Sequence, residues 1–270
     1  MKRLGIEIEF TGVKREEVVR ALENLFQTES KAVTNTSTNS PYLSYEISDY
    51  YGNIWKIVRD RSIKSQVYCE ESRFGVTDIV DPNFVYTCEL VSPILNSSTL
   101  PTLFIIIEVI KAIGGVVNNS CGIHIHIDKP DIKSICLLFK KFINMQDEIF
   151  NTFSVQENRQ SEYCKKFPSD INIPEFDSEK DFLDWYYKSF SVYEGDVPII
   201  KTSRYYGINM YAIESHNTIE FRIFNSSLSS VDIAKYIKFV LNFCYEFDDI
   251  CNYSIMLERY LQRELEKGVL

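Results

Sequence analysis

Apolar and polar residues alternate along several short stretches of the chain, which is typical of β-strands with one buried face. In residues 4–10 (LGIEIEF) the apolar side chains share one face, while Glu7 and Glu9 lie on the other. Residues 116–128 end in GIHIHID, where three isoleucines alternate with two histidines and an aspartate. Both stretches are therefore predicted to be strands whose second face is polar.

Four further stretches have the residue types and the alternation of strands. Pro93 ends the strand within residues 85–95, because proline has no backbone N–H to donate to the hydrogen bonds of a sheet. The four are residues 53–63, 85–95, 205–213 and 218–225. Residues 214–217 (ESHN) form the predicted turn between the last two.

Longer stretches with apolar residues three and four positions apart predict amphipathic helices. One begins near Leu100, with Pro101 in its first turn, and ends at the glycine pair 114–115. Residues 28–41 form a loop or an edge hairpin, and 155–176 are the candidate mobile loop. The other helices are predicted at residues 14–26, 131–153, 177–190, 226–247 and 254–267.

The order of these elements predicts an α+β fold. Direct connections between some strands favour a largely antiparallel sheet over a doubly wound parallel one. Helices would cover the apolar face of this sheet, so that the opposite face collects the polar residues of every strand. Since neither a repeat nor a linker divides the sequence, we expect one domain over residues 1–270.

Composition restricts the class of protein. Hydrophobic residues make up 45% of the chain and aromatic residues 14%, which is typical of a folded globular protein. The net charge of -9, without a basic run, argues against nonspecific nucleic-acid binding, which needs clustered lysine and arginine. No apolar stretch is long enough to cross a membrane. Seven scattered cysteines suit reduced thiols, so we expect a cytoplasmic protein without a secretion signal.

The polar face of the predicted sheet carries eight charged or histidine side chains. Most are acidic, and neighbouring carboxylates repel each other unless a cation neutralises them. Carboxylate oxygens suit Mg²⁺ or Mn²⁺, and Mg²⁺ is often bound together with nucleotide phosphates. A divalent metal site is therefore predicted on this face. The eight residues are Glu7, Glu9, Asp60, Glu89, His124, His126, Glu220 and Arg222.

Each of these motifs also has a simpler interpretation. An E-x-E strand is common on the solvated face of an amphipathic sheet, and Glu220 with Arg222 can be a surface ion pair. Paired histidines can fill hydrogen-bonding positions, and Asp128, close to Pro130, can cap the following helix. The recurrence of such residues on several separate strands is what favours a metal site.

Six motifs, in this order, resemble the amidoligase family of the glutamine synthetase-like carboxylate-amine ligases, from residue 4 to about 228. The motifs are GIEIEF, WKIVRDRSI, CELVSPIL, CGIHIHID, RYYGINMY and TIEFRIF. The glutamate-cysteine ligases are more distantly similar. This resemblance implies a curved, largely antiparallel sheet like the glutamine synthetase catalytic domain, with helices on its convex face and Mg·ATP on its concave face. It also implies ATP-dependent formation of an amide bond through an acyl phosphate.

The resemblance further implies a role for individual residues. Arg222 would neutralise the transferring phosphoryl group, and Asp60 occupies the acidic position of the second motif. Glu7, Glu9, Asp60 and Glu89 are implied to be metal ligands or substrate-positioning groups, and Glu220 is implied to be a metal ligand. The residues implied to face nucleotide or substrate are His124, His126, Arg204, Asn209 and Arg222.

Two departures from the family pattern bear on the substrate. Arg61 stands where the family usually has glycine, and FNSSLSS (224–230) replaces a Gly-Thr pair. Neither removes an implied ligand. The acid and the amine, whether small molecules or groups of a peptide or protein, stay open, as does a homo-oligomer. The acidic chain favours a cationic amine, and segment 155–176 is the expected determinant of substrate choice.

Three other functions remain as alternatives. HIHID is superficially similar to the H-x-H-x-D motif of metal-dependent hydrolases, but those sites usually need further histidines and only His216 remains. A guanidino kinase would use the same metals to phosphorylate nitrogen. A catalytically silent nucleotide-binding module is the third alternative, although every implied ligand is present.

Overall fold

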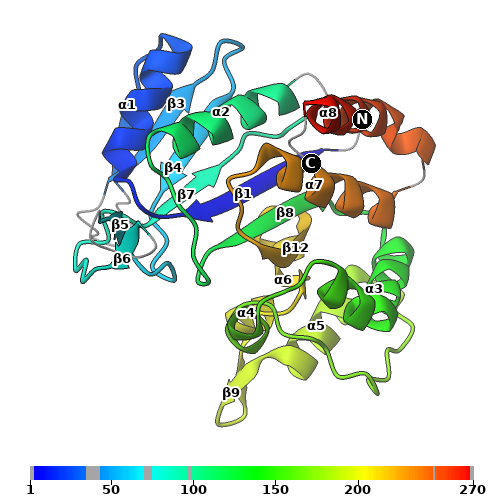
Figure 1. The fold of residues 1–270 in the computed structure, drawn as a ribbon. Coiled ribbons are helices and arrows are strands. Elements are labelled where there is room, and N and C mark those ends of the chain that lie inside the picture. The colour runs from blue at the N-terminus through cyan, green and yellow to red at the C-terminus, as the bar shows by residue number, and fades with distance from the viewer. Residues whose placement is uncertain (1–2, 35–42, 70–74, 97–98, 246, 268–270) are drawn as a thin grey trace. The chain divides into compact units, whose positions relative to one another are not determined.

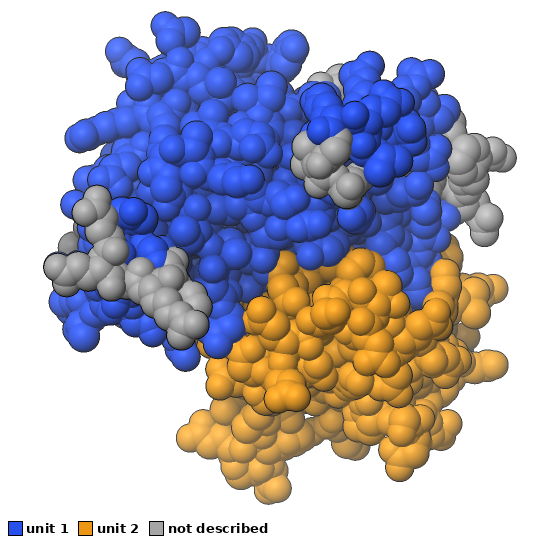
Figure 2. All heavy atoms as spheres, viewed as in Figure 1, with its two compact units in different colours: residues 1, 3–123, 226–270 blue, residues 2, 124–225 orange. Residues whose placement is uncertain are grey.

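The structure is a computed structural model, and the residues it describes fall into two units (Figure 2). The described residues are 3–34, 43–69, 75–96, 99–245 and 247–267. Unit 1 contains those of 3–123 and 226–270, and unit 2 contains 124–225. The chain therefore leaves unit 1 once and returns to it once. The expectation of a single domain over residues 1–270 stays a prediction.

Unit 1 contains an antiparallel sheet with the strand order β1-β7-β4-β3-β2. The alternation of residues 4–10 is confirmed, because the apolar side chains of β1 are buried. Residues 28–41 were predicted to be a loop or an edge hairpin; 31–34 form the edge strand β2, and 35–41 lie outside the described residues. Strand β3 and a small separate hairpin were not predicted. The strands are β1 (Leu4–Phe10), β2 (Lys31–Thr34), β3 (Leu43–Ser48), β4 (Ile54–Val58) and β7 (Cys88–Val91), with the hairpin β5 (Gln66–Tyr68) and β6 (Val76–Asp78).

Four helices belong to unit 1, and α1 and α2 lie over its sheet (Figure 1). Helix α1 contacts β3, β4 and α2, while α7 contacts both α2 and α8. Val18, Leu22 and Phe26 form the buried face of α1, as the spacing predicts. No helix in the described part of the chain is long and apolar enough to cross a membrane. The helices are α1 (Arg15–Phe26), α2 (Leu100–Ala112), α7 (Ser230–Cys244) and α8 (Phe247–Glu266).

Unit 2 has three neighbouring strands in the order β11-β12-β8, and α6 contacts β12. Strand β8 starts in unit 1 and belongs to unit 2 from His124 onward. The strands are β8 (Gly122–Asp128), β11 (Ile208–Asn209) and β12 (Thr218–Asn225), with the hairpin β9 (Val192–Glu194) and β10 (Val197–Ile199). The helices are α3 (Ile132–Thr152), α4 (Glu157–Glu162), α5 (Glu179–Phe190), the 3-10 helix η1 (Ile200–Arg204) and α6 (Tyr211–His216).

Aromatic side chains form much of the core of unit 2. Phe139 of α3 lies with its ring centroid 4.9 Å from that of Phe167 and 5.8 Å from those of Phe182 and Tyr186. Most of these pairs meet edge to face, the arrangement that the ring quadrupoles favour. The aromatic richness of the sequence is thus used to join α3 to α5.

Several predicted boundaries are wrong. The strand predicted at 116–128 begins only at Gly122. Of the strand predicted at 205–213, only Ile208–Asn209 form a strand (β11), and residues 211–213 belong to α6. Helix α6 ends where Asn217 adopts a left-handed backbone conformation, which asparagine tolerates at a helix end. The last helix begins at Phe247, earlier than predicted.

The segment 155–176, predicted as an irregular and mobile loop, contains α4 and is anchored in unit 2. Arg159, Cys164 and Phe167 are all buried. The prediction of a loop is therefore wrong over 157–162, where six residues are too few to show a helical period.

These findings confirm a mixed α+β fold with a large antiparallel sheet. The curvature of the sheet, the side on which its helices lie and the likeness to glutamine synthetase stay predictions.

Candidate functional site

Three carboxylates that the sequence placed on separate strands come together in unit 1. Glu9 of β1 is directly opposite Glu89 of β7, so their side chains leave the sheet on the same face. Asp60 follows the end of β4, the strand that pairs with the other side of β7. One oxygen from each of Glu9, Asp60 and Glu89 lies within 4.8 Å of the others. These three residues are called the carboxylate cluster below.

Hydrogen bonds hold two members of the carboxylate cluster in place. The backbone N–H of Gly122 donates to Oε2 of Glu9 at 2.6 Å, and only 3% of Glu9 is exposed. Ser62 donates to Oδ1 of Asp60 through both its backbone N–H and its hydroxyl, each at 2.6 Å. Both carboxylates are thus oriented before any ligand arrives.

The carboxylate cluster fits a hard divalent cation. Like charges directly opposite each other on neighbouring strands destabilise a sheet, and a bound cation removes that repulsion. The donor atoms of the cluster are all oxygens, which are the ligands that Mg²⁺ and Mn²⁺ prefer. Glu7, two residues before Glu9 on β1, lies opposite Val91 and is partly exposed.

Unit 2 contains a second group of predicted site residues, centred on Glu220 of β12. Arg222 donates through Nη1 to Oε1 of Glu220 at 2.5 Å, and Asn209 donates through Nδ2 to Oε2 at 2.5 Å. Nδ1 of His124 lies 3.5 Å from Oε1 of the same carboxylate. All four side chains are buried. These four residues are called the Glu220 network below.

The segment 155–176 supports Arg222 from outside the strands. Nε of Arg222 donates to the carbonyl of Tyr163 at 3.2 Å, and Nη2 of Arg159 donates to the carbonyl of Arg222 at 3.0 Å. Only 1% of Arg159 is exposed. Sequence reasoning missed both Arg159 and Tyr163, because the contacts use backbone carbonyls that carry no signal in the sequence.

Asn209 leaves one polar atom available within the Glu220 network. Its Oδ1 is buried and has no hydrogen-bond partner among the residues that the structure describes. A buried acceptor without a donor costs free energy unless a ligand or water satisfies it. Asn209 therefore offers an oriented acceptor beside the buried ion pair.

Of the remaining predicted residues, His126 lies beside the Glu220 network and Arg204 lies apart from it. A ring nitrogen of His126 is within 4.8 Å of a carboxylate oxygen of Glu220. Nδ1 of His126 is 2.9 Å from the hydroxyl of Thr218, and its ring lies 5.8 Å from that of His216. Arg204, at the end of η1, is exposed and its guanidinium stacks over Tyr205. Among the described residues no hydrogen bond joins Arg204 to Glu220 or Asn209.

The carboxylate cluster and the Glu220 network are each complete within one unit. The sequence predicted a single polar face that carries both. Their common use in one reaction stays a prediction.

Comparison with known proteins identifies the family to which the chain belongs. A search of curated protein sequences finds no match. A family model described as "Putative amidoligase enzyme" matches residues 1–244, which include every predicted site residue. Because this match covers nearly all of the sequence, the chain belongs to that amidoligase family.

Proposed function

We propose that this protein is an ATP-dependent carboxylate-amine ligase that forms an amide bond. The observation that carries the proposal is the carboxylate cluster, in which Glu9 and Glu89 face each other on neighbouring strands and Asp60 joins them. In a member of an amidoligase family, such a cluster is suited to the metal ion that accompanies ATP. The resemblance described above supplies the acyl-phosphate route.

The proposed reaction has two displacements. A carboxylate oxygen of the acid substrate attacks the γ-phosphorus of ATP, and the bond to the bridging oxygen breaks to release ADP. The amine lone pair then attacks the carbonyl carbon of the acyl phosphate. Phosphate departs with the electrons of the C–O bond, and the amine nitrogen loses a proton to water. The products are an amide, ADP and phosphate.

The carboxylates of unit 1 would hold Mg²⁺, or Mn²⁺ in its place, with Glu7 and Glu220 as further proposed ligands. When bound, the cation offsets the negative charge of the phosphates. The hydrogen bonds from Gly122 and Ser62 orient Glu9 and Asp60 without occupying all of their oxygen lone pairs. Preorganised ligands reduce the conformational entropy lost on binding.

Within the Glu220 network, Arg222 would supply the positive charge that faces the transferring phosphoryl group. Phosphoryl transfer depends mostly on positioning and charge neutralisation, and the planar guanidinium of Arg222 can donate to two phosphate oxygens. Its contacts with Glu220 and Tyr163 restrain that plane. The proposed nucleotide contacts also include His124, His126 and Asn209, with Arg204 placed at the substrate.

The first test is calorimetric titration of the whole chain with ATP, in the presence of Mg²⁺ and then with the metal chelated. We expect binding to require Mg²⁺ and to fall by at least about 10-fold in Glu89→Gln, because one anionic ligand becomes a neutral amide. The matched control is Glu29→Gln, an exposed residue outside the cluster, which should bind like the wild type.

The titration, together with assays of ADP release, of bound metal and of hydrolysis products, separates the proposal from its alternatives. ATP binding that ignores Mg²⁺, or that survives unchanged in folded Glu89→Gln, contradicts the assignment of the metal site. Release of ADP only when both an acid and an amine are supplied supports ligation. Tightly held zinc with release of a cleaved ester or amide would instead identify a hydrolase.

A further inference from the structure

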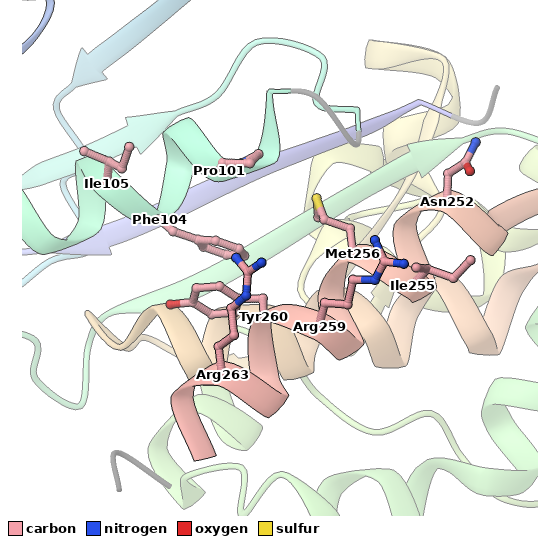
Figure 3. Close-up of a pocket in the computed structure, with 9 residues that line it drawn as sticks. All are labelled: Pro101, Phe104, Ile105, Asn252, Ile255, Met256, Arg259, Tyr260 and Arg263. Carbon is pink, nitrogen blue, oxygen red and sulfur yellow. The ribbon is translucent and has the colours of Figure 1, made fainter. Parts of the chain in front are cut away.

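A groove lies between α2 and α8 of unit 1, and its lining shares no residue with the carboxylate cluster or the Glu220 network (Figure 3). Its volume is about 580 Å³. Pro101, Phe104 and Ile105 line it from α2, and the lining on α8 extends from Asn252 to Arg263. Helix α8 begins at Phe247, beyond the part of the chain that matches the amidoligase family. The groove is therefore partly built by a segment outside the family match.

The floor of the groove is apolar. Phe104 and Tyr260 stack with ring centroids 4.3 Å apart and an interplanar angle of 23°. Met256 lies beside them, and Ile105 and Ile255 keep 52% and 41% of their surface exposed. Large aliphatic side chains this exposed on both walls of one groove mark an interaction surface more often than scattered single residues do.

Hydrogen bonds fix the floor in position. The hydroxyl of Tyr260 donates to Oγ of Ser230 at 2.6 Å, and Ser230 donates to Glu108 at 2.9 Å. These two consecutive hydrogen bonds link α8 to α7 and α7 to α2. The groove is thus held open by contacts among three helices, so a ligand meets a preformed surface.

Two arginines give the groove a positive wall. Arg259 and Arg263 are one helical turn apart, are exposed and extend from α8 in the direction of α2 (Figure 3). Neither forms an ion pair with any of the described residues. Two acidic residues near them on α8 form ion pairs with lysines instead: Glu258 pairs with Lys238 at 2.9 Å and Glu264 with Lys267 at 2.7 Å. Although the net charge of the whole chain is -9, these two arginines make the groove locally positive and suited to an anionic partner.

We propose that this groove binds an acidic amphipathic helix of a partner protein. The lining of α8 from Asn252 to Arg263 spans about 16 Å, the length of a three-turn helix. Apolar residues at i, i+3, i+4 and i+7 of such a helix would lie on Phe104 and Met256, a recognised mode of peptide binding. Carboxylates one turn apart would meet Arg259 and Arg263.

Charge argues against two other occupants. A two-fold pairing of this face with a second copy would bring the arginine pair of one chain against that of the other. An anionic membrane attracts clusters of four or more basic residues, whereas this groove has two and the chain is strongly acidic. An acidic peptide needs only the two arginines and the apolar floor.

The test is selection from a phage-displayed library of random 12-residue peptides on the purified whole chain, followed by fluorescence anisotropy of the enriched peptides. We expect the enriched sequences to combine apolar residues at helical spacing with Asp or Glu, and their affinity to fall at least about 10-fold in Arg259→Glu/Arg263→Glu. The matched control is Lys111→Glu/Lys235→Glu, which makes the same charge change at exposed positions of α2 and α7 outside the groove.

Each result decides the proposal. Failure to enrich peptides, enrichment of peptides without acidic residues, or equal loss in the control pair overturns it. A dimer in light scattering that Arg259→Glu/Arg263→Glu dissociates overturns it in favour of self-association. Since the groove shares no residue with the proposed ATP site, Arg259→Glu/Arg263→Glu should bind Mg·ATP like the wild type, so the two proposals fail independently.

Discussion

Asp49 shows how hydrogen bonds keep a buried carboxylate ionised in this protein. It follows β3, is buried, and accepts from Nε1 of Trp55 at 3.0 Å and from the backbone N–H groups of Tyr51 and Asn53 at 2.9 Å. Burial alone acts to raise its pKa, but the hydrogen bonds from Trp55, Asn53 and Tyr51 outweigh burial and lower the pKa below the ordinary aspartate value.

This shift predicts a dependence of stability on pH. Because the pKa of Asp49 is lowered in the folded state, the ionised carboxylate stabilises the fold above the ordinary aspartate pKa, and that stabilisation is lost as pH falls through the folded pKa. Asp49→Asn should lower the free energy of unfolding by roughly 1–3 kcal/mol near neutral pH. The deficit should shrink in acid, as urea denaturation at about pH 7 and about pH 3 can measure.

An exposed aspartate provides the comparison for Asp49. Asp196, in the turn of the hairpin β9–β10, is exposed, so Asp196→Asn should change the free energy of unfolding by less than about 0.5 kcal/mol at either pH. If the deficit of Asp49→Asn were equal at both pH values, the lowered pKa would not be the source of its stabilisation.

Two residues of the carboxylate cluster were predictable because strand alternation carries their orientation, whereas Asp60 lies beyond β4, which ends at Val58 and not at 63 as predicted. Glu9 and Glu89 lie on strands whose apolar reverse faces are evident in the sequence, and the structure pairs them directly. Arg159 was not predictable, since a buried arginine that donates to a backbone carbonyl leaves no pattern. Polar residues on regular strands are thus predictable, and supporting contacts from irregular segments are not.

At the scale of elements, the end of β1 depends on a close approach to the turn after α2. The backbones of Thr11 and Val116 exchange two hydrogen bonds of 2.8 and 2.9 Å. Gly12, the residue after Thr11, has φ +90°, and a Cβ atom there would lie 2.8 Å from the carbonyl oxygen of Gly114. Glycine is required here both for its backbone conformation and for its missing side chain.

Substituting two glycines with similar backbone conformation distinguishes the cost of the positive φ from the cost of crowding by a Cβ atom. Gly52, in the turn between β3 and β4, has φ +80° and nothing within 4 Å of a Cβ position. Gly52→Ala should cost about 1 kcal/mol for the backbone alone. Gly12→Ala should cost about 1–3 kcal/mol more, because Gly114 and Val116 must move. Urea denaturation of the two variants measures the difference, and equal losses would show that crowding at Gly12 is relieved without cost.

Element length decides which parts of the fold the sequence predicts. Strand β1 and helices α1 and α3 contain at least two full periods of their pattern, and all three were predicted. Strands β9 and β10 have three residues each and α4 has six, so a period cannot be recognised in them. Helix α6 occupies a stretch whose composition also suits a strand, so that the sequence does not distinguish the two, and it ends at the left-handed Asn217.

At the scale of the whole molecule, the chain distributes its proposed chemistry between two units. The proposed metal ligands Glu9, Asp60 and Glu89 belong to unit 1, whereas Arg222 and Asn209 belong to unit 2. Strand β8 carries the chain from unit 1 into unit 2. A reaction that needs a metal ion and an arginine on the same nucleotide would therefore require both units.

Hydrogen exchange read separately in the two units tests that requirement. At a Mg·ATP concentration about 100 times its Kd, binding should stabilise the regions that it requires by about 2.7 kcal/mol and slow their exchange roughly 100-fold. We expect this slowing in β1 and β7 of unit 1 and in β12 of unit 2, with the same dependence on concentration. Both effects should disappear in Glu89→Gln and persist in Glu29→Gln. Protection confined to unit 1 would remove Arg222 from the proposed mechanism, because an arginine that neutralises the transferring phosphoryl group must respond to the nucleotide.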